Sequence, residues 1–497
     1  MDELSIKEIV AAVDGELLCG DENVRITSVS TNSNSIEPGA LFVPIVGERV
    51  DAHDYIDSAF AHGAIACFTS RHESMRGSQA YIKVKDTIEA LQMLGAYYRN
   101  RFTLPVVGIT GSVGKTTTKE MIAAALATKY NVLKTDGNMN SQIGLPLMMF
   151  RIHSEHEIAV IEMGMSEVGE MAKLTLVAKP EVAVMTNIGV SHIGQLKTRE
   201  NIRKEKLNII NSFGKDSVLF VNGDDNLLNE INETAKGYIS NKESNLSSEI
   251  YKDKENSHFS ANIDISETSR DKLIEAKVVA FGTTPLCDYR AENIRTIEGK
   301  THFTLRNGKD DGEEIILSVL GIHNVNNALA ALAVASHYGI PASVSKLGLY
   351  DYRPIAMRGQ IKEINDIKII DDSYNASPDS MKGGIQILLE MDGVTRRIAV
   401  LADVLELGEI SYQCHYEVGA YIAEHKVDEV VTIGTEAAAI AKAIQDKGAQ
   451  IITNSFTNNQ EAITYLKNNL KAGDGVFIKG SRYMRTDEIV KALLEDK

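Results

Sequence analysis

The chain has 497 residues, of which 43% are hydrophobic and 24% are charged, the balance of an ordinary soluble globular protein. Its formal net charge of -16 at pH 7 argues against a nucleic-acid partner, because such a partner requires a basic surface. The first residues are acidic and lack the basic and apolar regions of a signal peptide, and no apolar run is long enough to span a bilayer. The four cysteines are far apart and show no metal-binding or redox spacing, so we expect a cytoplasmic protein without a membrane partner.

A chain of this length predicts about three domains. We place the first over residues 1–102, the second over 103–354 and the third over 355–497, all of them α/β. In the first unit a polar loop over 28–37 leads through a Pro-Gly turn into a strand over 40–44. The residues alone assign no ligand to this segment.

The second unit opens on a glycine-rich turn, with the sequence GITGSVGKTTTK over 108–119. It lies between a predicted strand over 104–107 and a predicted helix over 119–130, which is the setting of a phosphate-binding loop. Glycines let several backbone N–H groups point at an anion, and the helix dipole adds to their field. Ile109 stands where the strict pattern has its first glycine, so the match is to a variant. We predict that ATP is bound by Gly108, Ile109, Thr110, Gly111, Ser112, Val113, Gly114, Lys115, Thr116 and Thr117.

Within this loop, Lys115 is expected to reach the terminal phosphates and the Thr116 hydroxyl to bind Mg²⁺. A buried strand over 157–164 carries Glu162 at its end, where a carboxylate beside a phosphate loop is expected to be a magnesium ligand rather than a helix cap. A strand over 182–189 brings His192 to the same edge, and we favour a metal-ligand role over a structural one. The next helix contains Lys204 and Lys206.

The remaining segments complete the organisation of the chain. Residues 237–277 are polar with little periodicity, which indicates a surface insertion. Strands predicted over 367–370, 397–401, 430–433 and 475–478 alternate with helical patterns, which predicts a doubly wound, Rossmann-like parallel sheet in the third unit. The sequence DDSYNASP over 371–378 follows the first of these strands, where such folds bind ligands.

Taken together, these segments resemble the Mur ligases, the ATP-dependent amino-acid-adding enzymes of peptidoglycan synthesis. The resemblance covers nearly the whole chain, in motif order, and rests on GITGSVGKTTTK, GNMNSQIGLP, EMG, TNIGVSHI, GIHNVNNALAA, MRGQ and DDSYNASP. DDSYNASP, VLADVLELGE and FIKGSR most resemble the member that joins D-alanyl-D-alanine to UDP-N-acetylmuramoyl tripeptide. The sister enzyme that adds the third amino acid usually carries D-Y-A-H-x-P and D-N-P-R stretches, and neither occurs here.

The chain departs from the family pattern in places. Asn32 and Asn34 interrupt the usual S-T-D-S-R, Ala52 replaces the glycine of D-G-H, and Ala402 replaces the glycine before Asp403.

The resemblance implies a UDP-binding first domain, a central ATP-binding domain and a third domain that closes on it. ATP would convert the tripeptide carboxylate into an acyl phosphate, which the amine of the dipeptide would attack. The catalytic residues implied are Lys115, Lys206, His192 and Arg358, with Arg358 on the γ-phosphate. Asn324, Asp372 and Asn375 would hold the adenosine. Magnesium would lie among Thr116, Glu162, His192 and Lys206, the last as a carbamate. Most relatives act alone, so we expect a monomer.

Other interpretations fit less well. The sister ligase is the nearest alternative. A folylpolyglutamate synthetase shares the phosphate loop but not DDSYNASP. A GTPase needs an N-K-x-D segment, and the one Asn-Lys pair in the sequence, Asn241-Lys242, is followed by Glu243 and Ser244. A scaffold protein without catalytic activity is also a poor fit, because every ATP-site motif in this sequence has a suitable residue at each candidate position.

Overall fold

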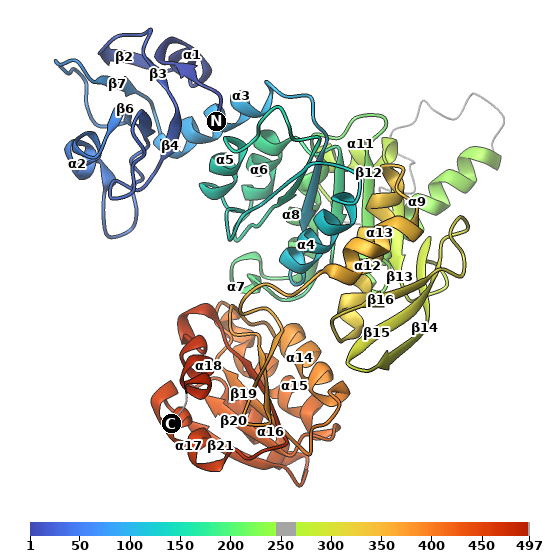
Figure 1. Ribbon diagram of the computed structural model, residues 1–497. Helices are drawn as coiled ribbons and strands as arrows, with labels where there is room; N and C mark the ends of the chain where they lie inside the picture. The colour runs from blue at the N-terminus through green and yellow to red at the C-terminus, as the bar shows by residue number, and fades with distance from the viewer. Residues whose placement is uncertain (245–264, 496–497) are drawn as a thin grey trace.

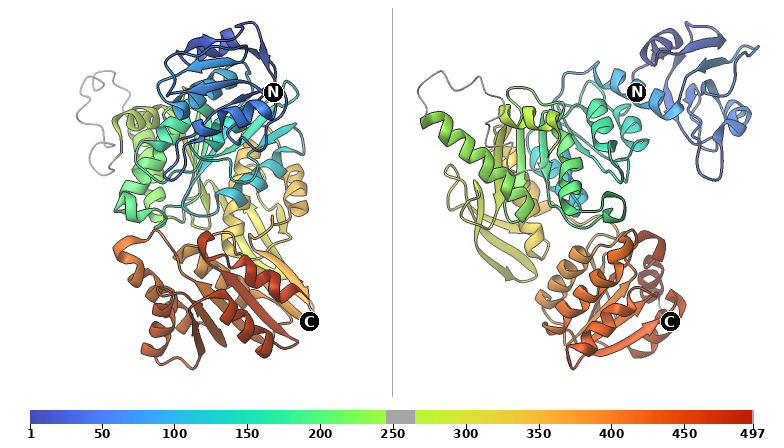
Figure 2. Two further views of the ribbon diagram at one scale, coloured as in Figure 1. Left: turned by 90° about the vertical axis from the view of Figure 1, so that its left-hand side faces the viewer. Right: turned by 180° about the vertical axis from the view of Figure 1, so that it is seen from behind.

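Three large sheets, of five, nine and six strands, follow one another along the chain in the computed structural model, which describes residues 1–244 and 265–495 (Figure 1). A small two-stranded sheet accompanies the first of them. Each large sheet belongs to an α/β unit, which confirms the predicted fold class. Figure 2 shows the N-terminal and C-terminal units at opposite ends of the molecule, with the central unit between them. No helix in the described part of the chain is both long and apolar enough to cross a bilayer.

The N-terminal unit contains a five-stranded sheet in the order β2-β7-β6-β5-β4. Strands β4 to β7 pair in parallel and β2 pairs antiparallel to β7. The predicted Pro-Gly turn connects β4 to β5, and Gly39 there has φ 86°, a conformation that favours glycine. The elements are β1 (Leu4–Ser5), α1 (Ile6–Ala12), β2 (Glu16–Cys19), β3 (Arg25–Ile26), β4 (Ser28–Ser30), β5 (Ala40–Phe42), η1 (Ala52–Tyr55), α2 (Ile56–Ala61), β6 (Ala64–Thr69), β7 (Ala80–Lys83) and α3 (Thr87–Arg99).

Helix α3 fixes this unit to the central one, because its buried face packs against α5 and α6 in a single apolar cluster. The hydroxyl of fully buried Tyr98 accepts from the Asp2 N–H at 2.7 Å and donates to the Ile152 carbonyl at 3.0 Å. The buried Arg99 guanidinium donates to the carbonyls of Ala178, Phe102 and Leu104. These bonds tie the two units together with few polar groups left unpaired.

The central unit is built on a nine-stranded sheet in the order β16-β15-β14-β13-β12-β11-β8-β10-β9. The strands from β9 to β14 pair in parallel, and β14, β15 and β16 form an antiparallel extension. The elements up to β12 are β8 (Val106–Thr110), α4 (Lys115–Leu126), β9 (Val132–Lys134), α5 (Gly144–Met149), β10 (Ile158–Glu162), α6 (Glu170–Ala178), β11 (Val182–Met185), α7 (Ile193–Leu196), α8 (Arg199–Leu207), η2 (Asn208–Ile210) and β12 (Val218–Asn222). The rest are α9 (Asn226–Ser244), α11 (Glu267–Glu275), β13 (Lys277–Gly282), β14 (Tyr289–Ile297), β15 (Lys300–Arg306), β16 (Glu314–Leu317), α12 (Ile322–His337) and α13 (Ala342–Asp351).

The C-terminal unit contains a six-stranded sheet in the order β17-β18-β22-β19-β20-β21, with separate apolar clusters on its two faces. The four predicted strands, β18, β19, β20 and β22, and the additional strand β21 pair in parallel, whereas β17 is an antiparallel edge strand. The elements are β17 (Gln360–Ile364), β18 (Ile367–Asp371), α14 (Pro378–Glu390), β19 (Arg396–Ala402), η5 (Gly408–Ile410), α15 (Ser411–Ala423), β20 (Glu429–Ile433), α16 (Ala438–Asp446), β21 (Ile452–Phe456), α17 (Asn459–Asn469), β22 (Asp474–Lys479), η6 (Arg482–Met484) and α18 (Asp487–Leu494).

Two sequence predictions differ from the structure in the central unit. The helix expected over 119–130 is α4, which begins at Lys115 and ends at Leu126. The first turn of α4 contains three successive threonines, whose β-branched side chains have low helix propensity, so the sequence does not indicate a helix there. The phosphate loop nevertheless holds this turn in a helical conformation. The middle of the insertion expected over 237–277, residues 245–264, is outside the described residues. The parts of the insertion on either side are helical, because α9 extends to Ser244 and α11 covers Glu267–Glu275.

Candidate active site

The phosphate loop joins the buried strand β8 to helix α4 and is held in shape by its neighbours. A Cβ at Gly111 would collide with the Thr186 side chain, and Gly114 has φ 83°, so both positions favour glycine. The Val113 N–H donates to Asn187 Oδ1 at 2.8 Å, and the Ser112 N–H donates to the Asn187 carbonyl at 3.1 Å. The loop conformation is therefore set before any anion binds.

Two lysines converge on one carbonyl oxygen of this loop. Lys115 Nζ donates to the Gly111 carbonyl at 2.7 Å, and Lys206 Nζ, from α8, donates to the same oxygen at 3.1 Å. The Lys206 side chain is almost completely buried. Burial, reinforced by the charge of Lys115, holds the pKa of Lys206 well below its usual range.

The Lys115 amine also has a depressed pKa. Burial lowers it, Glu162 opposes the shift, and the positive charge of Arg358 lowers it further. Three basic side chains, Lys115, Lys206 and Arg358, are thus gathered near one loop, an arrangement in which an anionic ligand would favour their charged forms.

Glu162 lies at the end of β10 with its carboxylate facing the loop. Its Oε2 accepts from the Thr116 hydroxyl at 2.9 Å and its Oε1 accepts from the Asn140 amide at 2.6 Å. The residue is buried and, in the described part of the chain, forms no direct ion pair with a lysine or arginine, although it interacts electrostatically with Lys115. A buried carboxylate without a direct cationic partner is costly, so a cation is expected here.

The donors around Glu162 are oxygens, which suits Mg²⁺. The Thr116 hydroxyl and one carboxylate leave most positions to phosphate oxygens and water, as is usual for this ion. The described residues contain no group of three or more His, Cys, Asp or Glu side chains placed so that they could hold a metal ion by themselves. A magnesium ion here would consequently depend on the nucleotide for several of its ligands.

His192 follows β11 in a left-handed conformation, φ 63°. Its Nδ1 lies 3.0 Å from Glu406 Oε2, which belongs to the C-terminal unit. The hydrogen bond from His192 lowers the pKa of Glu406. Sequence reasoning places His192 near the metal but does not find Glu406, because the pairing depends on how the two units dock.

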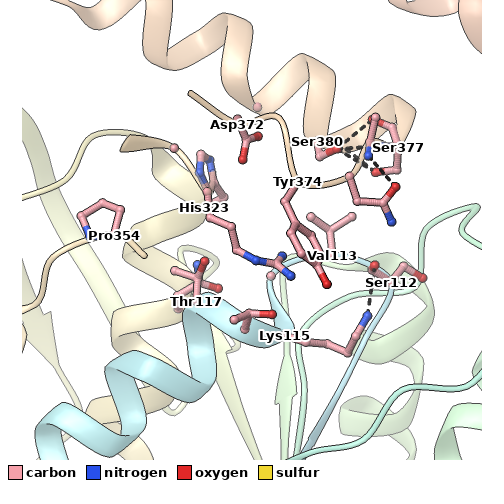
Figure 3. A pocket seen from close by; sticks show the side chains of 18 of the residues that line it. Ser112, Val113, Lys115, Thr117, His323, Pro354, Asp372, Tyr374, Ser377 and Ser380 are labelled. Atoms are coloured by element: carbon pink, nitrogen blue, oxygen red, sulfur yellow. Dashed lines mark hydrogen bonds between the residues drawn. The ribbon is translucent and has the colours of Figure 1, made fainter. Parts of the chain in front are cut away.

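The wall opposite the phosphate loop comes from the C-terminal unit, as Figure 3 shows. Tyr374 reaches from this wall toward Lys115, and the Arg358 guanidinium lies 4.0 Å from the centre of the Tyr374 ring. Asp372 is paired with the buried Lys479 at the ends of adjacent parallel strands. Asn375 is exposed, with its Oδ1 accepting from the Ala376 N–H at 2.9 Å.

Helix α12 supplies a third wall. Asn324 is buried, donates to the Leu320 carbonyl at 2.7 Å and accepts from the Asn327 amide at 3.2 Å. Asn327 in turn accepts from the Thr118 hydroxyl at 2.8 Å, which links α12 to α4. The motif GIHNVNN indicates this helix, but only the structure shows that its last asparagine, Asn327, donates to its first, Asn324.

One cavity of about 1120 Å³ brings these walls together, slightly more than the roughly 300–1,000 Å³ of most ligand sites. Its lining includes most of the residues predicted from the sequence: Ser112, Val113, Gly114, Lys115, Thr116, Thr117, Glu162, His192, Asn324, Arg358, Asp372 and Asn375. Gly108, Ile109 and Thr110 lie in the buried strand β8 behind it, and Lys206 lies below the loop. Asn140, Tyr374 and Lys479 line it as well; they belong to motifs quoted above, GNMNSQIGLP, DDSYNASP and FIKGSR, but were not predicted as individual site residues.

A phosphate loop and a buried carboxylate that face an arginine across one cavity define an enzyme that transfers a phosphoryl group from a nucleotide. The family models agree with this class. The Mur ligase family, catalytic domain matches residues 25–99, the Mur ligase middle domain matches 109–278 and 245–335, and the Mur ligase, glutamate ligase domain matches 357–482. The chain belongs to the Mur ligase family, whose members are ATP-dependent ligases.

Similar proteins cover the whole chain. The UDP-N-acetylmuramoyl-tripeptide–D-alanyl-D-alanine ligase of Bacillus subtilis is 36% identical, over 100% of this chain and 99% of that protein. A crystal structure of MurF from Acinetobacter baumannii is 27% identical and superposes with a TM-score of 0.85, over 100% of both chains. A crystal structure of MurF ligase from Thermotoga maritima in complex with ADP is 28% identical, over 94% of this chain and 96% of that one, with a TM-score of 0.76.

Proposed function

We propose that this protein joins D-alanyl-D-alanine to UDP-N-acetylmuramoyl tripeptide in an ATP-dependent reaction of peptidoglycan precursor synthesis. The observation that carries the proposal is the single cavity in which the phosphate loop faces Arg358, Asp372 and Tyr374. The names of the relatives that match this chain over its full length support the choice of substrates. The domain boundaries at 102/103 and 354/355, a cytoplasmic location and a monomeric state belong to the same proposal.

The reaction has two steps. An oxygen of the tripeptide carboxylate attacks the γ-phosphorus of ATP, so that ADP leaves and an acyl phosphate forms. The amine of the dipeptide then attacks the acyl carbon, loses a proton and displaces phosphate. No protein nucleophile is needed, so the work of the enzyme is positioning and charge stabilisation.

The residues of the cavity have roles in this scheme. Lys115 leaves the Gly111 carbonyl and contacts the transferring phosphoryl group, with Arg358 approaching it from the opposite wall. Asn324, Asp372 and Asn375 hold the nucleoside, and the remaining residues of the phosphate loop, Gly108 to Thr117, cradle the phosphates.

Thr116, Glu162, His192 and Lys206 would hold Mg²⁺, which when bound neutralises phosphate charge. Lys206 fits a carbamate, because a carbamate forms when a neutral amine attacks CO₂ and loses a proton, and burial beside Lys115 favours the neutral amine. The carbamate is an anion, and it would lie beside the basic side chain of Lys115. Replacing Lys206 with alanine should abolish turnover, and short carboxylic acids should partly restore it.

Phosphate release from ATP tests the proposal. We expect release that depends on both UDP-N-acetylmuramoyl tripeptide and D-alanyl-D-alanine, with either component alone giving only background. Release that is equally fast with any acceptor, or with water alone, would contradict the assignment.

A further inference from the structure

The segment from Val190 to Leu196 of the central unit is docked onto the C-terminal unit. Val190 and Ile193 pack against the apolar cluster of that unit, which includes Val404 and Leu407. The Gly194 N–H donates to the Glu406 carbonyl at 3.3 Å, and a Cβ at Gly194 would come within 2.9 Å of that oxygen. Any move of the C-terminal unit away from the cavity must break this contact.

At the centre of the docked segment, His192 faces Glu406. The pair is formed by His192 Nδ1 and Glu406 Oε2 at 3.0 Å, and the side chains are 26% and 63% exposed. Because a carboxylate accepts and does not donate, Nδ1 carries a proton, and in the neutral imidazole the lone pair of Nε2 is then free. His192 also lines the cavity, whereas Glu406 is outside it.

Both residues adopt left-handed backbone conformations, with φ 63° for His192 and 67° for Glu406. Such a conformation costs of the order of 1–3 kcal/mol at a non-glycine residue. A partly exposed pair of this kind stabilises the protein by only about 0–1 kcal/mol, even when both side chains are charged. The side-chain contact therefore stabilises the protein by less than the two strained backbone conformations cost. Backbone strain that is not offset locally is typical of functional sites.

We propose that Glu406 is a positioning residue that readies His192 for the metal when the C-terminal unit docks. The carboxylate fixes the Nδ1–H tautomer and the orientation of the ring, leaving Nε2 as the ligand atom, as outer-sphere carboxylates do for metal-bound histidines elsewhere. Domain docking and metal binding are thereby coupled through one hydrogen bond. This inference rests on the metal role proposed above for His192.

Binding of Mn²⁺, as a paramagnetic probe in place of Mg²⁺, tests the inference without turnover. Free Mn²⁺ is measured by electron paramagnetic resonance with the full-length protein and ADP. Glu406→Gln is expected to weaken Mn²⁺ binding by about tenfold, since loss of an outer-sphere partner typically costs roughly 10–100-fold. Glu409→Gln, an exposed position three residues away with the same charge change, should bind as the wild type does.

The double variant distinguishes positioning from a general charge effect. In a His192→Ala background, Glu406→Gln should weaken binding no further, because its effect passes through the histidine. An equal loss in both backgrounds, or identical binding by Glu406→Gln and Glu409→Gln, would overturn the inference. If His192→Ala weakens binding and Glu406→Gln does not, only this inference fails. If His192→Ala has no effect, the proposed metal role fails with it.

Discussion

Replacing Lys206 with methionine should change how stability depends on pH, because the wild-type amine is buried and its pKa is depressed. Lys115 Nζ and Lys206 Nζ lie 2.7 and 3.1 Å from the same oxygen, so they are less than about 6 Å apart. Two ammonium groups at that separation repel by about 3 kcal/mol at an effective dielectric of about 20. The native state therefore favours a neutral Lys206.

The sign of the effect follows from proton counting. Above the native pKa of Lys206 and below about 10.5, the unfolded chain binds one more proton than the native protein, so stability rises with pH. The slope is at most about 1.4 kcal/mol per pH unit for this lysine. The methionine side chain does not titrate and contributes no such pH dependence to the free energy of unfolding. Lys206→Met should therefore be more stable than the wild type near neutral pH, and the difference should shrink as pH rises.

Urea unfolding in CO₂-free buffer without nucleotide, at pH values from about 7 to about 10, measures the difference. Lys173→Met, at an exposed position in α6, is the control and should follow the wild-type curve in parallel. A Lys206→Met curve that is also parallel to the wild type would show that the buried amine is charged, and the reasoning for a carbamate would fail.

Two further changes test the cavity. Lys115→Ala should lower kcat by roughly 10²–10³, the usual loss for a charged transition-state contact, while the thermal unfolding temperature stays near that of the wild type; near-native kcat in a folded variant would refute the phosphate-loop assignment. Tyr374→Ala should lower kcat/KM by about tenfold because Arg358 loses the ring it stacks on, whereas Tyr374→Phe should retain activity. Equal losses in both Tyr374 variants would instead assign the effect to the hydroxyl.

Local patterns allowed much of the fold to be predicted from the sequence. The strand that ends at Glu162 and the glycines around Lys115 are contiguous features whose geometry follows from a few neighbouring residues. The start of α4 was misjudged because threonine propensity opposes a helix that the loop imposes. Strands β9, β12, β14 to β17 and β21 were among those not predicted. Of these, β14 to β16 form an antiparallel extension that a parallel α/β pattern gives no reason to expect, and β17 and β21 are the two edge strands of their sheet.

The contacts that organise the candidate site depend on distant parts of the chain. Lys206 and Gly111 are 95 residues apart, and no local pattern indicates that Lys115 shares the same carbonyl. Glu406 could not be found beside His192 without the docking of two units. The sequence therefore identifies many of the candidate residues, and the structure is needed to show which of them are in contact.

Separation of the nucleotide products by chromatography tests the central claim most directly. The protein is incubated with ATP, Mg²⁺ and either UDP-N-acetylmuramoyl tripeptide with D-alanyl-D-alanine, or UDP-N-acetylmuramoyl dipeptide with lysine or diaminopimelate. A site that pairs with the amide of a dipeptide rejects an amine that lacks it by a large factor. We expect a new UV-absorbing product from the first pair and little or none from the second. Robust product from the second pair alone would contradict the account and assign the protein to the sister ligase.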